Sequence, residues 1–192
     1  MKNLKERYNY IKAKQNEYIN HEDWTELIID SPKNGIFRIK IDTDDMEKIN
    51  KCVWCINKCW NKKTNTEPIW YAGSAQKDKD KNISVLLHRF IMNAPKGKVV
   101  DHINHDTLDC RKSNLRICTQ SQNKMNTRMQ CNNKSGHTGV RFNEKLVTPK
   151  WSAYIKVNLK RKHLGYFDTY EEAVIVREEA ERIVFGEYTR VD

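Results

Sequence analysis

Long apolar runs are missing from this chain. None of its 192 residues belongs to a run of roughly 18 apolar residues, the length that a membrane-spanning helix requires. The N-terminal segment, MKNLKERYNYIKAKQ, also lacks the apolar centre of a secretory signal peptide. These two absences predict a protein of the cytoplasm that has no membrane partner.

Cysteine is not scarce, but it lacks a pattern that favours disulfides or zinc. Six cysteines in a chain without a secretory signal are expected to be reduced thiols. Cys52, Cys55 and Cys59 form a C-x2-C-x3-C segment, and the others are scattered: Cys110, Cys118 and Cys131. A structural zinc ion needs a fourth ligand and usually paired knuckles, so we do not favour one here.

Acidic residues are almost absent from residues 110–165. This window holds thirteen Lys or Arg and one acid, Glu144, so its net charge of +12 exceeds the +10 of the whole chain. The rest of the chain is therefore slightly acidic, and the basic surface belongs to this window. Such a surface favours a polyanionic partner, because Lys and Arg neutralise phosphates and release counterions.

Apolar residues are also few, 38% against 31% charged residues. This composition fits two or three small units better than one large core, because small units bury a smaller share of their surface. We expect an α+β chain with an N-terminal arm of unknown role at 1–34, a small mixed unit with the functional motif at 35–131, and a C-terminal unit at 132–192. The chain shows no heptads or large apolar patch, so a monomer is expected, with a dimer as the alternative.

Local patterns place short elements in the first two parts. Residues 36–41 alternate apolar and polar and predict a half-buried strand, and residues 42–45 open a short helix. His88 ends an apolar run, which favours a packed, hydrogen-bonded histidine over a metal ligand. The other expected elements are a helix over 5–18, strands at 52–56, 69–72 and 83–87, a polar loop at 61–68 and a helical turn at 88–92.

The C-terminal part has a clearer pattern. After a polar linker at 131–136, strands are expected at 139–142, 151–158 and 160–167. A capping box at 169–172 begins a helix that ends at Gly186. Its apolar positions at helical spacing are Ala173, Val176, Ala180, Ile183 and Val184. Three strands and one helix make a two-layer module, which leaves a basic face of the sheet exposed.

Residues 99–126 carry the functional motif. They contain Asp101 beside His102, a loop rich in Asp, Asn and His, an apolar run at 115–118, and Asn123. Histidine is the usual base near neutral pH because its pKa is about 6.5. Asp101 and Asn123 offer the oxygen ligands that hard cations prefer. The set predicts a metal-assisted attack on a phosphodiester, with a twist or strand end bringing the two neighbouring side chains to one site.

The order of these residues resembles the HNH homing-endonuclease motif. The matching segments are His88-Arg89, Val100-Asp101-His102-Ile103-Asn104-His105-Asp106, Asp109, Ser113-Asn114-Leu115-Arg116 and Gln122-Asn123. The resemblance implies a ββα-metal finger around one divalent cation, Mg²⁺ or Mn²⁺. It implies that His102 is the general base, that Asp101 and Asn123 bind the metal, and that Asn114 braces the loop and orients the histidine. His105 stands where the family often has glycine.

The C-terminal part resembles an AP2-type DNA-binding domain. The resemblance lies in TGVR at 138–141, WSAYI at 151–155, HLGYF at 163–167 and EEA at 171–173. It implies a sheet that lies in the major groove of double-stranded DNA. The side chains that would face bases or phosphates are Arg141, Tyr154, Lys156, Arg161 and His163. The two resemblances occur together in phage and mobile-element endonucleases, which implies the cytoplasm of a bacterial host cell.

Two other functions stay open beside the leading one. A non-catalytic, transcription-factor-like protein would need only the AP2-type part, although binding alone does not require Asp101, His102, Asn114 and Asn123. An RNA-binding protein would fit the charge, but the chain has no RNP-like aromatic strand. The leading hypothesis is a metal-dependent, site-directed DNA endonuclease that nicks one strand or cuts both.

Overall fold

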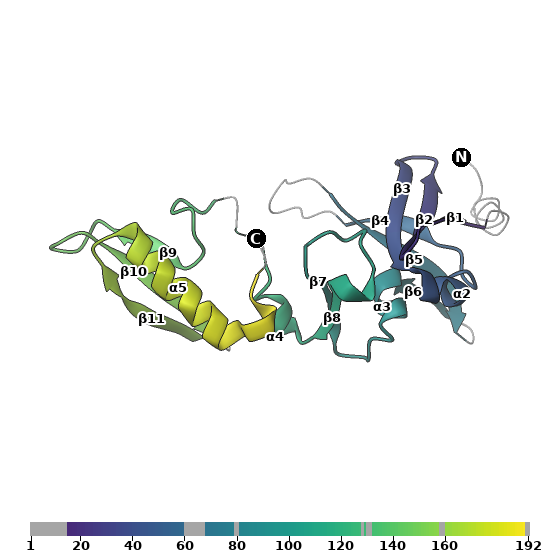
Figure 1. Cartoon of the computed structure of the whole chain (residues 1–192). Coiled ribbons are helices and arrows are strands. Elements are labelled where there is room, and N and C mark those ends of the chain that lie inside the picture. The colour runs from purple at the N-terminus through teal and green to yellow at the C-terminus, as the bar shows by residue number, and fades with distance from the viewer. Residues whose placement is uncertain are drawn as a thin grey trace. The chain divides into compact units, whose positions relative to one another are not determined.

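A computed structural model describes residues 15–59, 68–78, 81–127, 129, 132–157 and 160–190 of the chain. The chain folds as two compact units, Met1–Cys118 and Thr119–Asp192. Several small antiparallel sheets and short helices confirm the expected α+β class (Figure 1). The functional divisions predicted after residues 34 and 131 stay predictions. Within the described ranges, no helix is both long and apolar enough to cross a membrane.

The first unit opens with three antiparallel strands, β1 (Glu17–Asn20), β2 (Trp24–Ser31) and β3 (Gly35–Asp42), in that order across the sheet. Alternation in the sequence predicts β3, whereas β1 and β2 are findings of the structure. The helix predicted over 5–18 is wrong at its end, because Tyr18 lies in β1 and pairs with Leu27 of β2. Residues 5–14 of that prediction lie outside the described residues.

A second antiparallel sheet follows the short helices η1 (Thr43–Asp45) and α2 (Met46–Ile49). It consists of β4 (Cys55–Cys59), β5 (Ile69–Asp78) and β6 (Lys81–Leu86), and α3 (Leu87–Ile91) confirms the helical turn expected next. The strand predicted at 52–56 begins at Cys55 instead. Its predicted first half is held in the core, where Trp54 Nε1 donates to Ile49 O at 2.9 Å. Most of the expected polar loop, residues 61–67, lies outside the described residues.

One hydrophobic core joins these two sheets to a β-hairpin. The hairpin is formed by β7 (Val99–His102) and β8 (Leu115–Cys118), with η2 (Lys112–Asn114) in the long loop between them. Val100 and Leu115 of the hairpin are buried in this core. Because burial of apolar surface stabilises a fold by roughly 25 cal/mol per Å², this core is the main support of the hairpin.

Hydrogen bonds fasten the hairpin loop to both sheets. Lys40 N donates to Leu108 O at 2.9 Å, and Cys110 N donates to Lys40 O at 2.8 Å. On the second sheet, the Thr107 hydroxyl donates to Trp70 O at 2.7 Å. The loop that follows β7 is therefore held at three points by strands from earlier in the chain, which limits the positions its side chains can take.

The second unit is a sheet covered by a helix. After α4 (Gln120–Asn123) come β9 (Val140–Asn143), β10 (Lys150–Val157), β11 (Lys160–Phe167), α5 (Tyr170–Phe185) and η3 (Gly186–Tyr188). The strand order is β11-β10-β9, and α5 runs along one face of the sheet (Figure 1). This confirms the three-stranded sheet on one helix. The expected capping box is also confirmed, because Thr169 and Glu172 each accept a hydrogen bond from the other's backbone N–H.

The buried face of α5 differs from the predicted one. Ala173 is fully buried, but Ile183 is 76% exposed and Val184 is 40% exposed. The helix instead turns Tyr170, Val174 and Arg177 toward the sheet. Arg177 lies against Gly139, where a Cβ atom would come within 2.3 Å of the Arg177 Nε atom. The close approach of a glycine backbone to an arginine sets the rotation of the helix, and apolar spacing alone does not reveal it.

Candidate functional site

Asp101 and His102 form the buried end of β7. Asp101 pairs with Arg116 across the hairpin, and His102 pairs with Leu115. Their relative exposures are only 7% and 6%. Because neighbouring strand residues point to opposite faces, Asp101 lies on the side of Arg116, whereas His102 points toward the interior rings described below. His102 is the last residue of the strand, and the two side chains leave the strand on opposite faces.

The rings of His88 and Tyr71 lie next to His102. The His88 ring meets it edge-on, with centroids 4.9 Å apart, and the Tyr71 ring lies 6.3 Å away. His102 Nε2 is 4.0 Å from Cys110 Sγ, which burial keeps protonated by raising the pKa of that thiol. His88 is 6% exposed and packs against Tyr71 at 5.6 Å. The structure thus confirms that His88 is a packed histidine.

Both imidazoles are held in the neutral form. Burial lowers the pKa of His102, and the nearby carboxylates of Asp101, Asp106 and Asp109 only partly oppose this effect. Burial lowers the pKa of His88 to about 3, and the neighbouring His102 and Arg89 act in the same direction. At neutral pH His102 is therefore unprotonated, which is the form that a general base needs.

Asn114 ties together both limbs of the hairpin loop. Its Nδ2 donates to Asp109 O at 2.8 Å, and its Oδ1 accepts from Asn104 N at 3.0 Å. Its backbone oxygen also accepts from Ile103 N at 2.9 Å, directly after His102. These bonds fix the backbone that leaves the histidine. They support the bracing part of the role expected for Asn114, and its effect on catalysis stays a prediction.

The turn after His102 contains a strained residue. His105 has a φ of 63°, in the left-handed region that glycine adopts most readily. Its backbone N–H donates to His102 O at 3.1 Å and closes the turn. The glycine of the family motif is thus replaced here by a histidine in a glycine-like conformation. Histidine tolerates this region better than most residues, which explains how the turn survives.

Charged pairs that the sequence did not single out stabilise the same loop. Asp109 accepts from Arg111 at 2.8 Å and 2.6 Å, and Lys112 Nζ lies 2.8 Å from Asp45. Although burial acts to raise it, the pKa of Asp109 is lowered by the hydrogen bonds and charge of Arg111. Arg116 was also not identified from the sequence as the partner of Asp101. Its signal was available, because a hairpin of two short strands places Arg116 opposite Asp101.

Asn123 is the last residue of α4, in the second unit. The Thr119 side chain accepts from Gln122 N, and Gln122 accepts in turn from the backbone and hydroxyl of Thr119. This capping box fixes the start of the short helix that carries the amide. Because Asp101 belongs to the first unit, a shared metal centre of Asp101 and Asn123 stays a prediction.

The cysteines lie in different surroundings. Cys52 and Cys55 are half-buried, Cys59 is exposed, and Cys110 and Cys118 are buried. Cys131 lies outside the described residues. Among the residues that are described, no three His, Cys, Asp or Glu side chains gather in a way that could hold a metal ion. Any cation at the hairpin would therefore have at most two ligands of these four residue types from the described residues.

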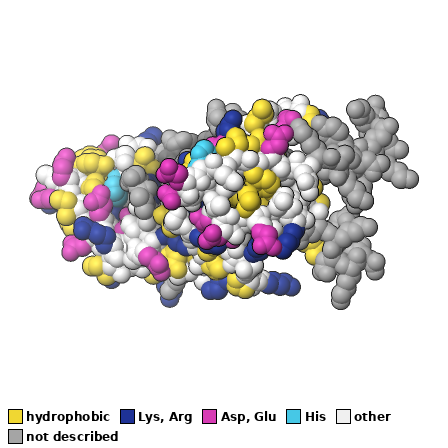
Figure 2. All heavy atoms as spheres, turned by 45° about the vertical axis from the view of Figure 1, so that its right-hand side comes forward, with side chains coloured by type: hydrophobic (Ala, Val, Ile, Leu, Met, Phe, Trp, Pro, Cys, Tyr) yellow, Lys and Arg dark blue, Asp and Glu magenta, His cyan; other side chains and the backbone are white. Residues whose placement is uncertain are grey.

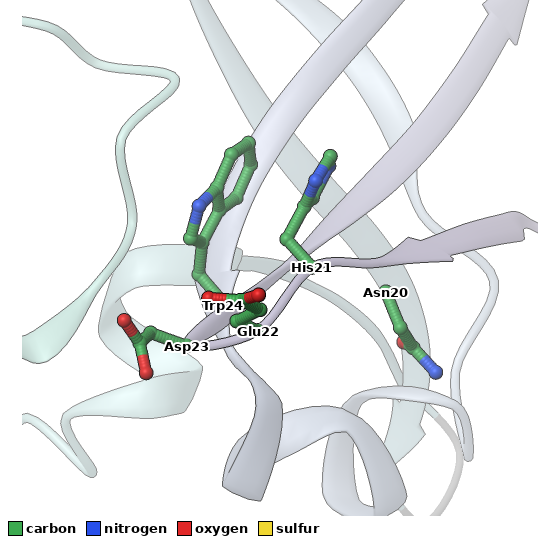
Figure 3. Close-up of a pocket in the computed structure, with 5 residues that line it drawn as sticks. All are labelled: Asn20, His21, Glu22, Asp23 and Trp24. Atoms are coloured by element: carbon green, nitrogen blue, oxygen red, sulfur yellow. The ribbon is translucent and has the colours of Figure 1, made fainter.

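A hollow at the β1–β2 turn is separate from these residues. It is lined by five consecutive residues, from Asn20 to Trp24. Figure 3 shows the His21 and Trp24 side chains side by side, and their rings stack with centroids 4.0 Å apart. In that view, Glu22 and Asp23 do not point toward a common centre. None of the predicted site residues lines the hollow.

The five predicted DNA-contacting residues do share one face of the C-terminal sheet. Pairing places Arg141 opposite Ser152, Tyr154 opposite His163, and Lys156 opposite Arg161. These positions alternate along β10, so they project from the face that α5 does not cover. The Arg161 guanidinium lies 3.4 Å above the Tyr154 ring centre, a cation–π contact that holds both side chains on the surface.

Tyr166 extends this face and was missed by the sequence reasoning. It pairs with Ser152, is 53% exposed, and its ring lies 4.6 Å from the His163 ring. A register shift between Ala153 and Tyr154 brings it onto the polar side. Strict alternation along β11 cannot reveal that, since the shift changes which residues face outward.

The opposite layer of the second unit is acidic. Helix α5 carries five glutamates and two arginines, and Arg177 is one of these and is buried. Figure 2 shows acidic and basic side chains interspersed on the visible face of the molecule. The basic sheet face, with its exposed Arg141, Lys156 and Arg161, is thus backed by a layer of the opposite sign.

A buried Asp–His pair at the end of a braced hairpin, with the imidazole held neutral, defines a candidate hydrolytic centre. Comparison with known families makes the class specific: residues 93–125 match the family model described as HNH endonuclease. Residues 93–125 are thus similar to the HNH endonucleases, a family of phosphodiester hydrolases that generally use a divalent metal.

A viral protein is also similar to this chain. It is described as an uncharacterized HNH endonuclease of Acanthamoeba polyphaga mimivirus and is 29% identical over 126 residues. The similar region covers 62% of this chain and 64% of the viral protein, slightly less than two thirds of its length. No solved structure matches the chain. The resemblance of the second unit to AP2-type domains stays a prediction.

Proposed function

We propose that this protein is a metal-dependent, site-directed DNA endonuclease of the homing type. The hairpin of β7 and β8 hydrolyses the phosphodiester, and the C-terminal sheet selects where. The observation that carries the proposal is the buried, neutral His102 beside Asp101 at the end of β7, inside the segment that matches the HNH family.

His102 acts as the general base. Its neutral imidazole accepts the proton of the attacking water. The His88 and Tyr71 rings restrict its rotation, and Asn114 fixes the backbone on its C-terminal side. A base held in one orientation loses little entropy in reaching the transition state, so this packing contributes to the rate.

Asp101 and Asn123 would hold the cation. The donor set fits a hard ion, because a buried carboxylate and the oxygen of a carboxamide are ligands that Mg²⁺ prefers. A bound Mg²⁺ or Mn²⁺ supplies charge neutralisation at the phosphoryl oxygens and help for the leaving oxygen. Arg116 lies on the same side of the hairpin, and its two hydrogen bonds hold the Asp101 carboxylate in one direction.

The exposed face of the C-terminal sheet binds double-stranded DNA. Arg141, Lys156 and Arg161 supply positive charge for phosphates, while Tyr154 and His163 add rings that can contact bases. The acidic α5 layer behind the sheet repels phosphates and so favours binding through the sheet face. We propose an AP2-type arrangement in which this face enters the major groove.

A non-catalytic DNA-binding protein is the second candidate. One observation favours it: Asp101 is engaged by Arg116 at 2.7 Å and 2.9 Å, as in a purely structural ion pair. In that case the sheet face would bind DNA, and the hairpin would only stabilise the first unit. The experiment below separates the two candidates.

The test is strand scission of supercoiled plasmid that carries candidate target sites. Wild-type protein, His102→Ala and the matched control His21→Ala, a surface histidine, are incubated with Mg²⁺, with Mn²⁺ or with EDTA. We expect wild type and the control to nick in metal only, and His102→Ala to lose at least 100-fold in rate, about the contribution of a general base. Equal nicking by all three proteins, or nicking in EDTA, would contradict the endonuclease. Specific retention of DNA without cleavage would favour the second candidate.

The same assay reports the number of chains that act together. We expect a monomer that nicks one strand, because one chain holds one such centre. Nicking would then rise in proportion to protein concentration. A double-strand break whose rate rises with the square of the concentration would instead indicate a dimer.

A further inference from the structure

Arg116 is bound to the carboxylate that is proposed to hold the metal. Its Nε and Nη2 atoms lie 2.9 Å and 2.7 Å from the same atom, Asp101 Oδ2. Only 11% of the Arg116 side chain and 8% of the Asp101 side chain are exposed. Exposed ion pairs contribute little, but a pair this shielded from water is held strongly, because water does not compete for either charge.

The pairing is built into the hairpin. Asp101 and Arg116 are direct cross-strand partners in the β7–β8 ladder. Their backbones are fixed by that ladder, and the next pair, His102 with Leu115, is anchored in the core. The guanidinium therefore stays close to Asp101 even if the carboxylate gains a second partner.

A cation and Arg116 compete for one negative charge. A divalent ion on Asp101 would be a near neighbour of the guanidinium, and like charges in a poorly hydrated place repel strongly. Asp106 and Asp109 add negative charge near His102, but Asp109 is already paired with Arg111. A phosphodiester oxygen would relieve the repulsion, since it is an anion that both the cation and Arg116 can approach.

We propose that Arg116 is the resident counter-charge of Asp101, which weakens cation binding by the DNA-free protein and couples cation uptake to the arrival of a phosphodiester. This inference rests on the proposed function, because it takes Asp101 as a metal ligand. A purely positioning role would have the opposite effect on cation affinity, because an arginine that only oriented Asp101 would strengthen cation binding.

The test is direct binding of Mn²⁺, without any activity readout. Free Mn²⁺ is measured by electron paramagnetic resonance during titration of DNA-free wild type, Arg116→Gln, Arg116→Lys, Arg111→Gln and Asp101→Asn. We expect Arg116→Gln to bind Mn²⁺ about 10-fold more tightly than wild type, within the usual range of coupling between two sites. Arg116→Lys, which keeps the charge, should remain within about 3-fold of wild type.

Arg111→Gln is the matched control. It removes another arginine–aspartate pair of the same hairpin, in the loop between β7 and β8, on a carboxylate outside the proposed ligand set. It should leave Mn²⁺ affinity close to that of wild type, which separates the local effect of Arg116 from loss of any positive charge. If Arg116→Gln does not fold, as judged by circular dichroism, Arg116→Met keeps the apolar stem and is expected to give the same tightening.

The outcomes separate the inference from the proposed function. Unchanged Mn²⁺ binding by Asp101→Asn would overturn the ligand assignment and with it the proposed centre. Loss of binding in Asp101→Asn together with unchanged or weaker binding in Arg116→Gln would overturn only the counter-charge. In the non-cleaving His102→Ala background, a mixed-sequence DNA duplex should tighten Mn²⁺ binding more with Arg116 than with Arg116→Gln, and equal tightening would overturn the coupling.

Discussion

At the scale of single residues, the site depends on two imidazoles that burial keeps neutral. In its proposed role as general base, His102 needs this form to accept a proton, whereas His88 has it because the core, Tyr71 and His102 enclose it. The flat, polar ring of His88 fills the space beside His102. The same burial makes the protein sensitive to acid, because a proton on His88 is costly in the folded state only.

The first prediction concerns this acid sensitivity. The pKa of His88 is about 3 in the folded protein and about 6.5 in the unfolded chain, so unfolding takes up a proton between these values. The stabilisation is therefore complete above pH 6.5 and is lost as the pH falls toward 3. We expect wild type to lose roughly 2–3 kcal/mol more than His88→Gln between pH 7 and pH 4, as measured by urea unfolding. His21→Gln should behave as wild type, and identical pH slopes for wild type and His88→Gln would contradict a neutral His88.

The second prediction concerns the backbone of His105. Its φ of 63° is strained for a side chain with a Cβ atom, and more so for a β-branched one. We expect His105→Val to lower the free energy of unfolding by about 1–2 kcal/mol. His105→Gly should be neutral or slightly stabilising, because relief of strain offsets the greater freedom of the unfolded chain. Thermal unfolding of the three proteins measures both effects, and equal loss in the two variants would show that the side chain of His105, and not its backbone, matters.

At the scale of elements, local patterns predict those parts of the fold that local chemistry controls. Alternation predicts β3 and the strands of the second unit, and the residues at 169–172 predict the start of α5. Features that depend on strand pairing or burial between residues far apart in the chain cannot be predicted from local sequence patterns. Examples are the pairing of β1 with β2, the rotation of α5 against Gly139, and the register shift that exposes Tyr166.

The candidate site divides in the same way. The motif includes His88, Asp101, His102, Asn114 and Asn123, whereas only the structure shows that the rings of His88 and Tyr71 lie against His102. The hydrogen bonds between the hairpin loop and Lys40 also come from a distant strand. Residues that act through neighbours from other elements have no fixed spacing in the chain, so a motif cannot specify them.

The third prediction tests the loop as an element. Asn114→Ala removes the acceptor of Asn104 N and the donor to Asp109 O, and it leaves both backbone groups unpaired near a buried site. We expect a loss of about 2–4 kcal/mol, since each unsatisfied buried group costs about 1–3 kcal/mol. Hydrogen exchange of the amides of residues 103–109 should accelerate. The matched control is Asn34→Ala, in an exposed turn, which should leave that exchange unchanged. Unaltered protection in Asn114→Ala would contradict the bracing role.

At the scale of the whole molecule, both units are basic, Met1–Cys118 with a net charge of +6 and Thr119–Asp192 with +4. The first holds the candidate site at Asp101 and His102, and the second presents a basic sheet face backed by an acidic helix. Within the positive window 110–165, Arg141, Lys156 and Arg161 lie together on the exposed face of the C-terminal sheet. The net charge of +10 would not by itself predict which surface binds.

The last prediction compares positive charges on the two layers of the second unit. Lys156 lies on the exposed sheet face, whereas Arg182 is exposed on α5 among glutamates. If the sheet face binds DNA, Lys156→Ala should weaken binding and reduce the slope of log K against log salt by about 0.9, the contribution of one phosphate contact. Arg182→Ala removes the same charge and should change neither quantity. Fluorescence anisotropy of a labelled duplex at several salt concentrations measures both, and equal changes in the two variants would show that binding follows net charge and not the sheet face.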